Sequence, residues 1–357
     1  MLAYISDRAN DYDARKILNE LACAAKNLGI LESKIASYQF DAILIPMLLK
    51  KEAVSSMYIE GTETTVPDIL KNEIEVNAIE DKIQLEVRNH TKTLIMGAEH
   101  LRTGKFTHSF IKKLHECMMT GIIKPELEDT VGKYKSQDNK ITNSAGTVVY
   151  TPPSAAETKK YMDELITFMN NGNDNIHPLI KAAMIHSQFE SIHPFSDGNG
   201  RIGRVLISLY LYKSGVINFP FFYISEAINM DKGVYYKMLT DSRNNTLTEW
   251  IRYFLIKVNV QTNQHIGYID ALNALYIKTK ATIKQCIKSP KYDEIIECLF
   301  THPVLNASML EDQLTVSRGQ ALRYLNVLEE KHILLSNDRK RGKTFFFTEL
   351  LDLARRA

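Results

Sequence analysis

One short segment near the middle of the chain limits how its neighbours can fold. Residues 193–204 read HPFSDGNGRIGR and lie between two strongly apolar stretches, 178–191 and 202–214. Both stretches carry apolar residues at helical spacing, so we expect a helix, a tight loop and a second helix. Gly198 and Gly200 allow backbone N–H groups to turn inward as an anion-binding nest. The second helix would point its positive end at the same place.

Charged and titratable side chains border this loop. Arg201 and Arg204 lie three residues apart and would project from neighbouring points on the first turn of the second helix. Asp197 adds a carboxylate where a Mg²⁺ ion would be shared between the protein and bound phosphates. His193 ends the first helix, and its ordinary pKa suits a general base for a hydroxyl nucleophile. The combination predicts a binding site for a di- or triphosphate.

Most of the remaining sequence predicts helices, because apolar residues recur at three- and four-residue spacing. One helix is expected to start near Pro46, a residue favoured in the first turn, and to end before Gly61. The other expected helices cover about residues 13–26, 80–97, 109–120, 155–169, 235–240 and 248 to beyond 280, and one more starts near 66–68. The chain is therefore expected to be mainly α.

One segment interrupts the helical pattern with β-branched residues. Residues 139–143 and 147–151 flank a short loop that ends in Gly146. This arrangement predicts a β-hairpin over about residues 139–151. Two consecutive prolines, at 152–153, follow the hairpin before the next helix.

The last part of the chain has a pattern of its own. Short helices are expected around 295–299, at 307–314 and at 317–331, with Ser317 as the N-cap of the third. Two strands, at 333–335 and 344–347, would follow. Three helices followed by a hairpin is typical of a winged-helix domain whose third helix is in the recognition position. The expected division is a helical region at about 1–95, a core at about 96–285 and a winged-helix domain at about 290–357.

Composition narrows the class of protein. A chain of 357 residues is too long for one ordinary core, and a net charge of +2 argues against a globally cationic nucleic-acid coat. The four cysteines form no CxxC pair, which favours reduced thiols over disulfides or zinc. The first residues lack a signal-peptide core, and the strongest apolar run is too short to span a bilayer. We therefore expect a cytoplasmic protein without a membrane partner.

The segment at 193–204 resembles the signature of the Fic family, HPF-x-(D/E)-GNG-R-x-x-R, at every defined position. Residues 188–192 before it and Ile202-Gly203 within it agree with this resemblance. The likeness covers roughly residues 40–250 and implies a Fic-type helical bundle in which the hairpin is the flap. An exposed flap strand would bind an extended segment of a target protein by edge pairing.

The resemblance also implies an activity, namely transfer of AMP from ATP to a hydroxyl side chain of a target protein or of the chain itself. His193 would deprotonate the hydroxyl, and Asp197 would hold Mg²⁺. The residues that would bind the nucleotide phosphates are Gly198, Asn199, Gly200, Arg201 and Arg204. Family members often form dimers, so a homodimer is expected. Lys135 precedes the flap at a position where the family often has arginine, and no role for it follows from the sequence.

A second motif resembles the inhibitory helix of the family, (S/T)-x-x-x-E-(G/N). Ser56 and Glu60 are four residues apart, so they share one helix face, and Gly61 follows. By resemblance, Glu60 would pair with Arg204 and take over the γ-phosphate-binding role of that arginine. A bidentate Arg–carboxylate pair is strong when it is shielded from water, which predicts self-inhibition.

Two alternatives remain open at this point. One is an enzyme of the same fold that removes AMP or uses another nucleotide donor. The other is a DNA-binding regulator with a nucleotide-sensing site, since Arg339, Lys340, Arg341 and Lys343 lie in the expected wing. DNA binding is the less favoured reading because winged helices also serve protein contacts, and because a sensor has no need of His193.

Overall fold

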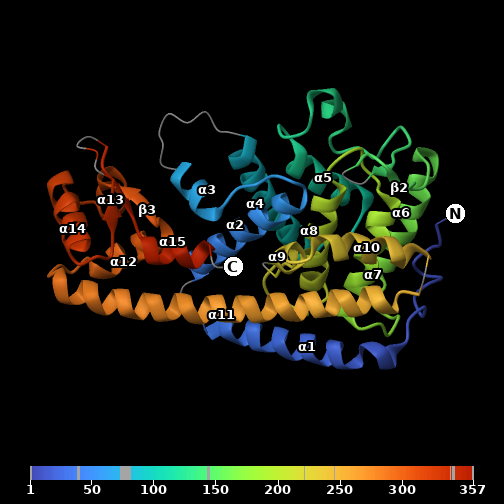
Figure 1. The fold of residues 1–357 in the computed structure, drawn as a ribbon, viewed down its shortest axis with the longest axis horizontal. Coiled ribbons are helices and arrows are strands. Elements are labelled where there is room, and N and C mark those ends of the chain that lie inside the picture. Colours follow the sequence, from blue (N-terminus) through green and yellow to red (C-terminus); the bar gives the residue numbers. More distant parts are fainter. Residues whose placement is uncertain are drawn as a thin grey trace.

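The computed structural model describes residues 2–37, 41–72, 82–142, 145–220, 222–244, 246–337, 339 and 342–355. These residues are mostly helical, with two small antiparallel sheets, which confirms the expected mainly α class (Figure 1). The helices are α1 (Ala14–Ser37), α2 (Asp41–Ile59), α3 (Val66–Asn72), α4 (Lys82–Leu101), α5 (His108–Met119), η1 (Pro125–Thr130), α6 (Ala155–Asn170), α7 (Pro178–Ile192), α8 (Asn199–Lys213), α9 (Ser225–Asn229), α10 (Lys232–Asn244), α11 (Thr248–Cys286), α12 (Tyr292–Thr301), α13 (Ala307–Leu314), α14 (Arg318–Glu330) and α15 (Thr348–Arg355). The strands are β1 (Ile141–Thr142), β2 (Val148–Tyr150), β3 (Val304–Asn306), β4 (Leu335–Ser336) and β5 (Thr344–Phe346).

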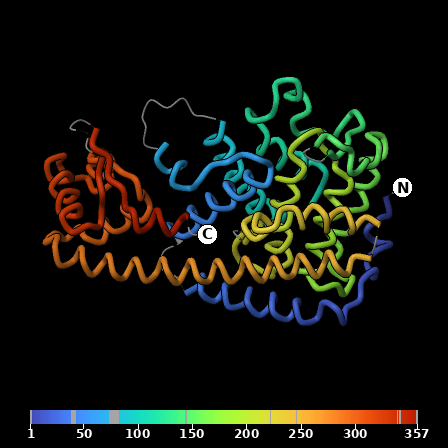
Figure 2. Tube along the Cα trace, in the orientation of Figure 1, coloured from blue at the N-terminus to red at the C-terminus, as the bar shows by residue number. Residues whose placement is uncertain are grey.

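The long helix α11 runs along most of the molecule, and α1 packs beside it (Figure 2). Helices α5 to α8 and α10 gather at one end of α11, and α12 to α15 gather at the other (Figure 1). Helices α2, α3 and α4 lie between these two groups (Figure 1). None of the described helices combines the length and the apolar character needed to cross a bilayer.

The central pair of helices, α7 and α8, positions the loop at 193–199. Every residue of α7 after Pro178 is buried, so the helix is fixed on all sides. Helix α7 stops at His193, which has a left-handed backbone with φ 49°, and α8 starts after Gly198, which has φ 78°. The two left-handed residues bound a tight turn, which is the helix–loop–helix arrangement expected from the sequence.

Helix α8 starts at Asn199, three residues before the predicted start of the helical pattern. The apolar spacing resumes only at Ile202, whereas the helical backbone includes the polar residues before it. Gly200 therefore lies in the first turn of α8 rather than in a free loop. This places the first N–H groups of the helix, which have no partner within the helix, beside the glycines.

The prediction that a helix starts near Pro46 is wrong. Helix α2 starts at Asp41, and Pro46 lies inside it. Proline removes one backbone hydrogen bond from a helix interior. Ile43, Leu44 and Met47 are nevertheless buried around it, and this packing holds the helix together.

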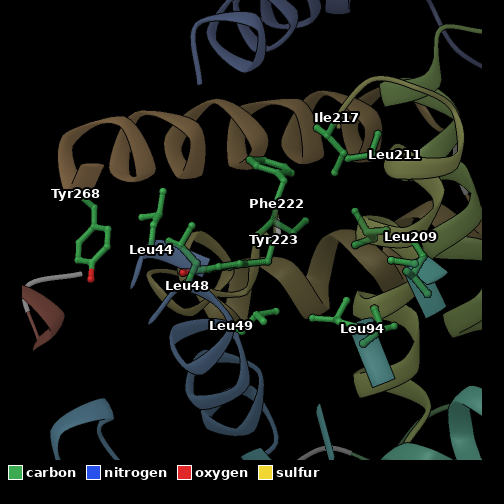
Figure 3. Packing of buried hydrophobic residues seen from close by; sticks show 14 of the residues in the cluster. Leu44, Leu48, Leu49, Leu94, Leu209, Leu211, Ile217, Phe222, Tyr223 and Tyr268 are labelled. Carbon is green, nitrogen blue, oxygen red and sulfur yellow. The ribbon is translucent and has the colours of Figure 1, made fainter. Parts of the chain in front are cut away.

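Helix α2 packs on the same apolar core as the site helices. Leu44, Leu48 and Leu49 lie near Phe222 and Tyr223, and Leu209 of α8 lies farther along the same core (Figure 3). Burial of such side chains stabilises by about 1.5–3 kcal/mol each. The segment that carries Ser56 and Glu60 is thereby held against the body of the protein.

The C-terminal part contains the expected three helices and two strands, together with elements that the sequence pattern did not predict. Strand β3 joins the sheet in the order β3-β5-β4, and α15 follows it. Ser317 caps α14 as expected, because its Oγ accepts a hydrogen bond from the Gln320 N–H. Residues 338, 340 and 341 of the expected wing lie outside the described residues, and Lys343 pairs with Glu329. The domain limits stay a prediction.

Candidate active site

The loop after α7 is closed by its own side chains. The Phe195 N–H donates to Asn199 Oδ1 at 2.8 Å, and Asn199 Nδ2 donates back to the Phe195 carbonyl at 2.8 Å. Phe195 is fully buried, so it anchors the loop in the core. The side-chain amide of Asn199 is thus occupied within the loop. The sequence predicted nucleotide binding for Asn199 but not this closing role.

His115 on α5 contacts the loop through Asp197 and Phe195. No sequence motif singled out this residue. Its Nδ1 accepts a hydrogen bond from the Gly132 N–H at 3.0 Å, so Nε2 carries the proton and donates to the Asp197 carbonyl at 3.0 Å. The ring stacks on Phe195 with centroids 3.9 Å apart. Burial lowers the pKa of His115 to about 4, which keeps this ring neutral and its two hydrogen bonds intact at neutral pH.

His193 presents a neutral imidazole. Its side chain is 22% exposed, and Nδ1 lies 4.0 Å from Oε2 of Glu190, one turn earlier on α7. Burial, assisted by the nearby positive charge of Lys135, lowers the pKa of His193 to about 4. Burial raises the pKa of Glu190 to about 7. The imidazole is therefore unprotonated at neutral pH, which is the form that accepts a proton.

Arg201 is held by two carboxylates. Its Nη1 donates to Oε1 of Glu86 on α4 at 2.7 Å, and its Nη2 donates to Oδ1 of Asp197 at 3.3 Å. Its Nε has no hydrogen-bond partner among the described residues. Glu86 is buried and comes from a helix more than a hundred residues earlier, so no sequence motif pointed to it.

Arg204 meets the residues expected from the second motif. Its Nη2 donates to Glu60 Oε1 at 2.7 Å and to the Ser56 carbonyl at 3.1 Å, and its Nε donates to Ser56 Oγ at 3.0 Å. The arginine side chain is 2% exposed, whereas that of Glu60 is 33% exposed. One carboxylate oxygen takes part in the ion pair, so the pair is not the bidentate one expected from the sequence.

Glu60 also lies directly over the start of α8. A Cβ added at Gly200 would be 2.6 Å from Glu60 Oε1, so only glycine allows this approach. Burial would raise the pKa of the Glu60 carboxyl, but the charges of Arg204 and Arg201 outweigh burial and lower that pKa. An ionised carboxylate therefore faces the positive end of a helix, where an anion is favoured.

Asp197 has the exposure and the chemistry for a shared Mg²⁺ ion. Its side chain is 39% exposed, and Oδ1 accepts hydrogen bonds from the Gly198 N–H at 2.6 Å and from Arg201. Mg²⁺ in phosphate sites is commonly held by one or two carboxylates plus substrate oxygens. Among the described residues there is no cluster of three or more side chains able to hold a metal ion. One carboxylate beside an anion site fits the shared arrangement rather than an all-protein cage.

The expected hairpin is present beside the site. Strands β1 and β2 pair antiparallel, with Ile141 opposite Tyr150, and Val148 and Val149 are exposed. Residues 143–144 of the expected hairpin lie outside the described residues. The Tyr150 ring lies 3.9 Å from the guanidinium group of Arg243 on α10. This cation–π contact fixes one end of the hairpin against the helices.

Two family models match the chain in succession. The N-terminal model of the Fic/DOC family matches residues 18–99, and the Fic/DOC family model matches residues 105–211. Together they cover more than half of the chain. The second match contains the loop, both arginines and the hairpin, and the first contains Ser56 and Glu60.

Individual relatives are distant. A probable protein adenylyltransferase of Aquifex aeolicus is 23% identical over 253 residues, which is 68% of this chain and 74% of that protein. A protein adenylyltransferase of Nematostella vectensis is 28% identical over 127 residues, 34% of this chain and 26% of that protein. The chain thus spans about a quarter of the sea-anemone protein and three quarters of the bacterial one.

A solved structure extends the likeness in fold to nearly the whole chain. A Fic family protein of Desulfovibrio desulfuricans G20 superposes with a TM-score of 0.57 at 20% identity and covers 93% of this chain and 95% of that one. The likeness therefore includes the helices after the core as well as the loop between α7 and α8. With the two family models and the loop geometry, it identifies the chain as a member of the Fic/DOC family, an enzyme family of nucleotidyltransferase type.

Proposed function

We propose that this protein transfers AMP from ATP to a hydroxyl side chain of a target protein or of the chain itself. The observation that carries the proposal is the neutral imidazole of His193 beside a helix N-terminus with two buried arginines. The relatives named as protein adenylyltransferases support this chemistry at the general level.

In the proposed reaction, His193 Nε2 accepts the proton of the target hydroxyl while the oxygen attacks the α-phosphorus of ATP. The bond from the α-phosphorus to the bridging oxygen breaks, and pyrophosphate leaves. Arg201 and Arg204 stabilise the negative charge on the phosphates, and the first N–H groups of α8 add their dipoles. A Mg²⁺ ion held by Asp197 would neutralise further phosphate charge. Catalysis depends on position and charge, because the protein forms no covalent bond to the nucleotide.

The proposal includes self-inhibition by Glu60. In support, Glu60 accepts the hydrogen bond of Arg204 at 2.7 Å and lies above Gly200. A γ-phosphate that uses Arg204 would compete with this carboxylate for the same Nη2 atom. ATP would then bind with its phosphates out of line for transfer.

For the target, we propose an extended segment that pairs with the hairpin. The exposed Val148 and Val149 offer an edge beside the site. Main-chain pairing of this kind orients a hydroxyl without reading much of the target sequence.

The test uses wild type, Glu60→Gly and Glu60→Gly/His193→Ala, each incubated with Mg²⁺ and ATP. Intact-mass spectrometry detects AMP on the chain, and α-labelled ATP in a cell extract detects AMP on other proteins. We expect labelling to be strongest in Glu60→Gly and to vanish in the double variant. Glu63→Gly, which changes an exposed glutamate three residues away, is the matched control and should behave as wild type.

Two results would contradict the proposal. Equal labelling by wild type and Glu60→Gly would contradict the proposed self-inhibition. If a folded Glu60→Gly protein labels neither itself nor any protein of the extract, the proposed AMP transfer is contradicted.

A further inference from the structure

The segment just before the hairpin, residues 135–139, binds the loop that carries His193. We call this segment the root of the hairpin. The Lys135 N–H donates to the Pro194 carbonyl at 2.8 Å, and Lys135 Nζ donates to the Ile192 carbonyl at 3.2 Å. Asn139 Nδ2 donates to the His193 carbonyl at 3.2 Å and to the Phe195 carbonyl at 3.1 Å. Two residues thus bind four successive carbonyl groups, those of residues 192–195.

Lys135 and Asn139 also bind each other, through Lys135 Nζ and Asn139 Oδ1 at 2.8 Å. The lysine is 4% exposed, and burial lowers its pKa to about 8. A buried ammonium group is costly unless its hydrogen bonds are satisfied. Here the acceptors are the Asn139 amide and the Ile192 carbonyl at the end of α7, so the ammonium group keeps both hydrogen bonds only while residues 135–139 stay against the start of the loop.

The geometry of His193 shows why this support matters. Its backbone is left-handed, with φ 49° and ψ 61°. Residues other than glycine adopt this conformation only at a cost in free energy. The hydrogen bonds to residues 192–195 hold both peptide planes that flank this residue. The direction in which the imidazole leaves the backbone therefore depends on Lys135 and Asn139.

Lys135 also acts on the imidazole through its charge. After burial, its positive charge is the largest cause that lowers the pKa of His193. The other groups that act on the His193 pKa come from three elements. Glu190 on α7 acts through its backbone and places its carboxyl 4.0 Å away, and Arg243 on α10 and Glu60 after α2 act through their charges. Arg243 acts in the same sense as Lys135, and Glu60 opposes both.

We propose that Lys135 and Asn139 are positioning residues that orient His193 for its reaction and tie it to the root of the target-binding hairpin. The inference rests on the proposed AMP transfer. The hairpin starts within two residues of Asn139, so the segment that would pair with a target peptide and the segment that holds the base are continuous. When a target strand binds to the hairpin and shifts it, the hydrogen bonds of residues 135–139 carry this shift to the loop of His193.

The kinetic test places Lys135→Met, Lys135→Arg and Asn139→Ala in the Glu60→Gly background. We expect Lys135→Met and Asn139→Ala to lower kcat about 10- to 100-fold with an unchanged KM for ATP, because they misplace the base and leave the phosphate site intact. Lys135→Arg should keep most of the rate, since it retains the charge and the donors. Lys133→Met, on an exposed lysine of the same segment, is the matched control.

The second test needs no turnover. In protein labelled with ¹³C-histidine, NMR follows the titration of His193, assigned by its loss in His193→Ala. Removing the neighbouring cation should move the His193 pKa upward in Lys135→Met, while Lys135→Arg and Lys133→Met should leave it in place. If Lys135→Met does not fold, Asn139→Ala carries the kinetic arm, and Lys135→Gln carries the titration.

The two proposals fail in different ways. An inactive Glu60→Gly protein removes AMP transfer but leaves the titration of His193 measurable. An active Glu60→Gly protein in which Lys135→Met and Asn139→Ala turn over within about twofold of Lys133→Met overturns the positioning role. An unchanged His193 pKa in folded Lys135→Met overturns the electrostatic part.

Discussion

Arg204 Nη2 donates a hydrogen bond of 2.7 Å to Glu60 Oε1, although 144 residues separate the two along the chain. The arginine side chain makes all of its described hydrogen bonds to Ser56 and Glu60. Its guanidinium group is therefore oriented by the end of α2 before any phosphate arrives. The proposed inhibition of AMP transfer by Glu60 therefore depends on the hydrogen bonds by which Ser56 orients the same arginine.

Ser56→Ala tests this dependence. The substitution removes the 3.0 Å bond from Arg204 Nε while Glu60 stays in place. A lost hydrogen bond of this kind costs about 1 kcal/mol, so self-labelling with AMP should rise roughly fivefold, less than in Glu60→Gly. Ser55→Ala, one residue away, is the control. Labelling of Ser56→Ala at the level of this control would show that the serine has no part in the inhibition.

Glu86 provides a test of Arg201. Glu86→Ala leaves a buried cation with only the weaker 3.3 Å contact to Asp197. Removing one partner of a buried pair typically costs about 3–5 kcal/mol, so thermal unfolding should occur at lower temperature. In the Glu60→Gly background the KM for ATP should rise about 10-fold or more, because each 1.4 kcal/mol of lost binding is tenfold.

Glu86→Gln, which keeps an acceptor for Arg201, should lie between Glu86→Ala and wild type. Glu99→Ala, on an exposed glutamate of the same helix, should match wild type in both KM and unfolding temperature. A Glu86→Ala variant with the KM of Glu99→Ala would contradict the role given to this pair.

Gly203→Ala tests the close packing of α7 on α8. A Cβ at this position would lie 2.3 Å from Glu190 Oε1 and 3.2 Å from the His186 ring. Overpacking typically costs about 1–3 kcal/mol, so chemical denaturation should show a lower free energy of unfolding. Gly267→Ala in α11 meets no atom within 4 Å and should instead stabilise by up to about 1 kcal/mol. Equal changes in the free energy of unfolding for the two substitutions would show that α7 can shift to accommodate the added methyl group without loss of stability.

Glu52 predicts a dependence of stability on pH. Burial raises its pKa to about 8, while Ser225 Oγ donates to its Oε1 at 2.7 Å. In the unfolded chain this carboxyl titrates near 4.5, so between pH 4.5 and about 8 the folded state binds a proton that the unfolded state releases. The contribution of Glu52 therefore falls as pH rises through this window, by up to about 1.4 kcal/mol per pH unit.

The comparison of wild type with Glu52→Gln isolates this effect by denaturant unfolding between pH 6.5 and 8. Buried histidines such as His90, whose pKa burial lowers to about 3, act in the opposite sense. Their contribution to stability is lost as pH falls through about 6.5, so it changes mainly at the lower end of the chosen range and affects wild type and Glu52→Gln alike. We expect the free energy of unfolding to fall with pH in wild type and to fall less in Glu52→Gln. Identical slopes would mean that Glu52 is ionised in the folded protein.

Several features followed from the sequence because their causes are local. The loop at 193–199 needs two turning points between apolar helices, and the spacing of Gly198 from the flanking apolar runs already placed it. Ser317 caps α14 because an N-cap depends only on residues within one turn. The hairpin followed from β-branched residues around a glycine. The pairing of Glu60 with Arg204, which are 144 positions apart, has no local cause and was expected only from the resemblance to the Fic family.

Other features depended on residues that meet only in the folded chain. The position of Pro46 inside α2 was decided by the apolar packing of its neighbours Ile43, Leu44 and Met47, which outweighs the lost hydrogen bond. Strand β3 is three residues long and is formed by its pairing with β5, forty residues later.

The partners of the loop belong to the same class. Glu86, His115, Lys135 and Asn139 reach the loop from elements 54 to 115 residues away along the chain. Local sequence determines which backbone turns and helix ends are possible, since these depend on dihedral preferences and neighbours within one turn. Which distant carboxylate, imidazole or ammonium group lies against them is decided by the packing of whole helices, and only the tertiary structure shows it.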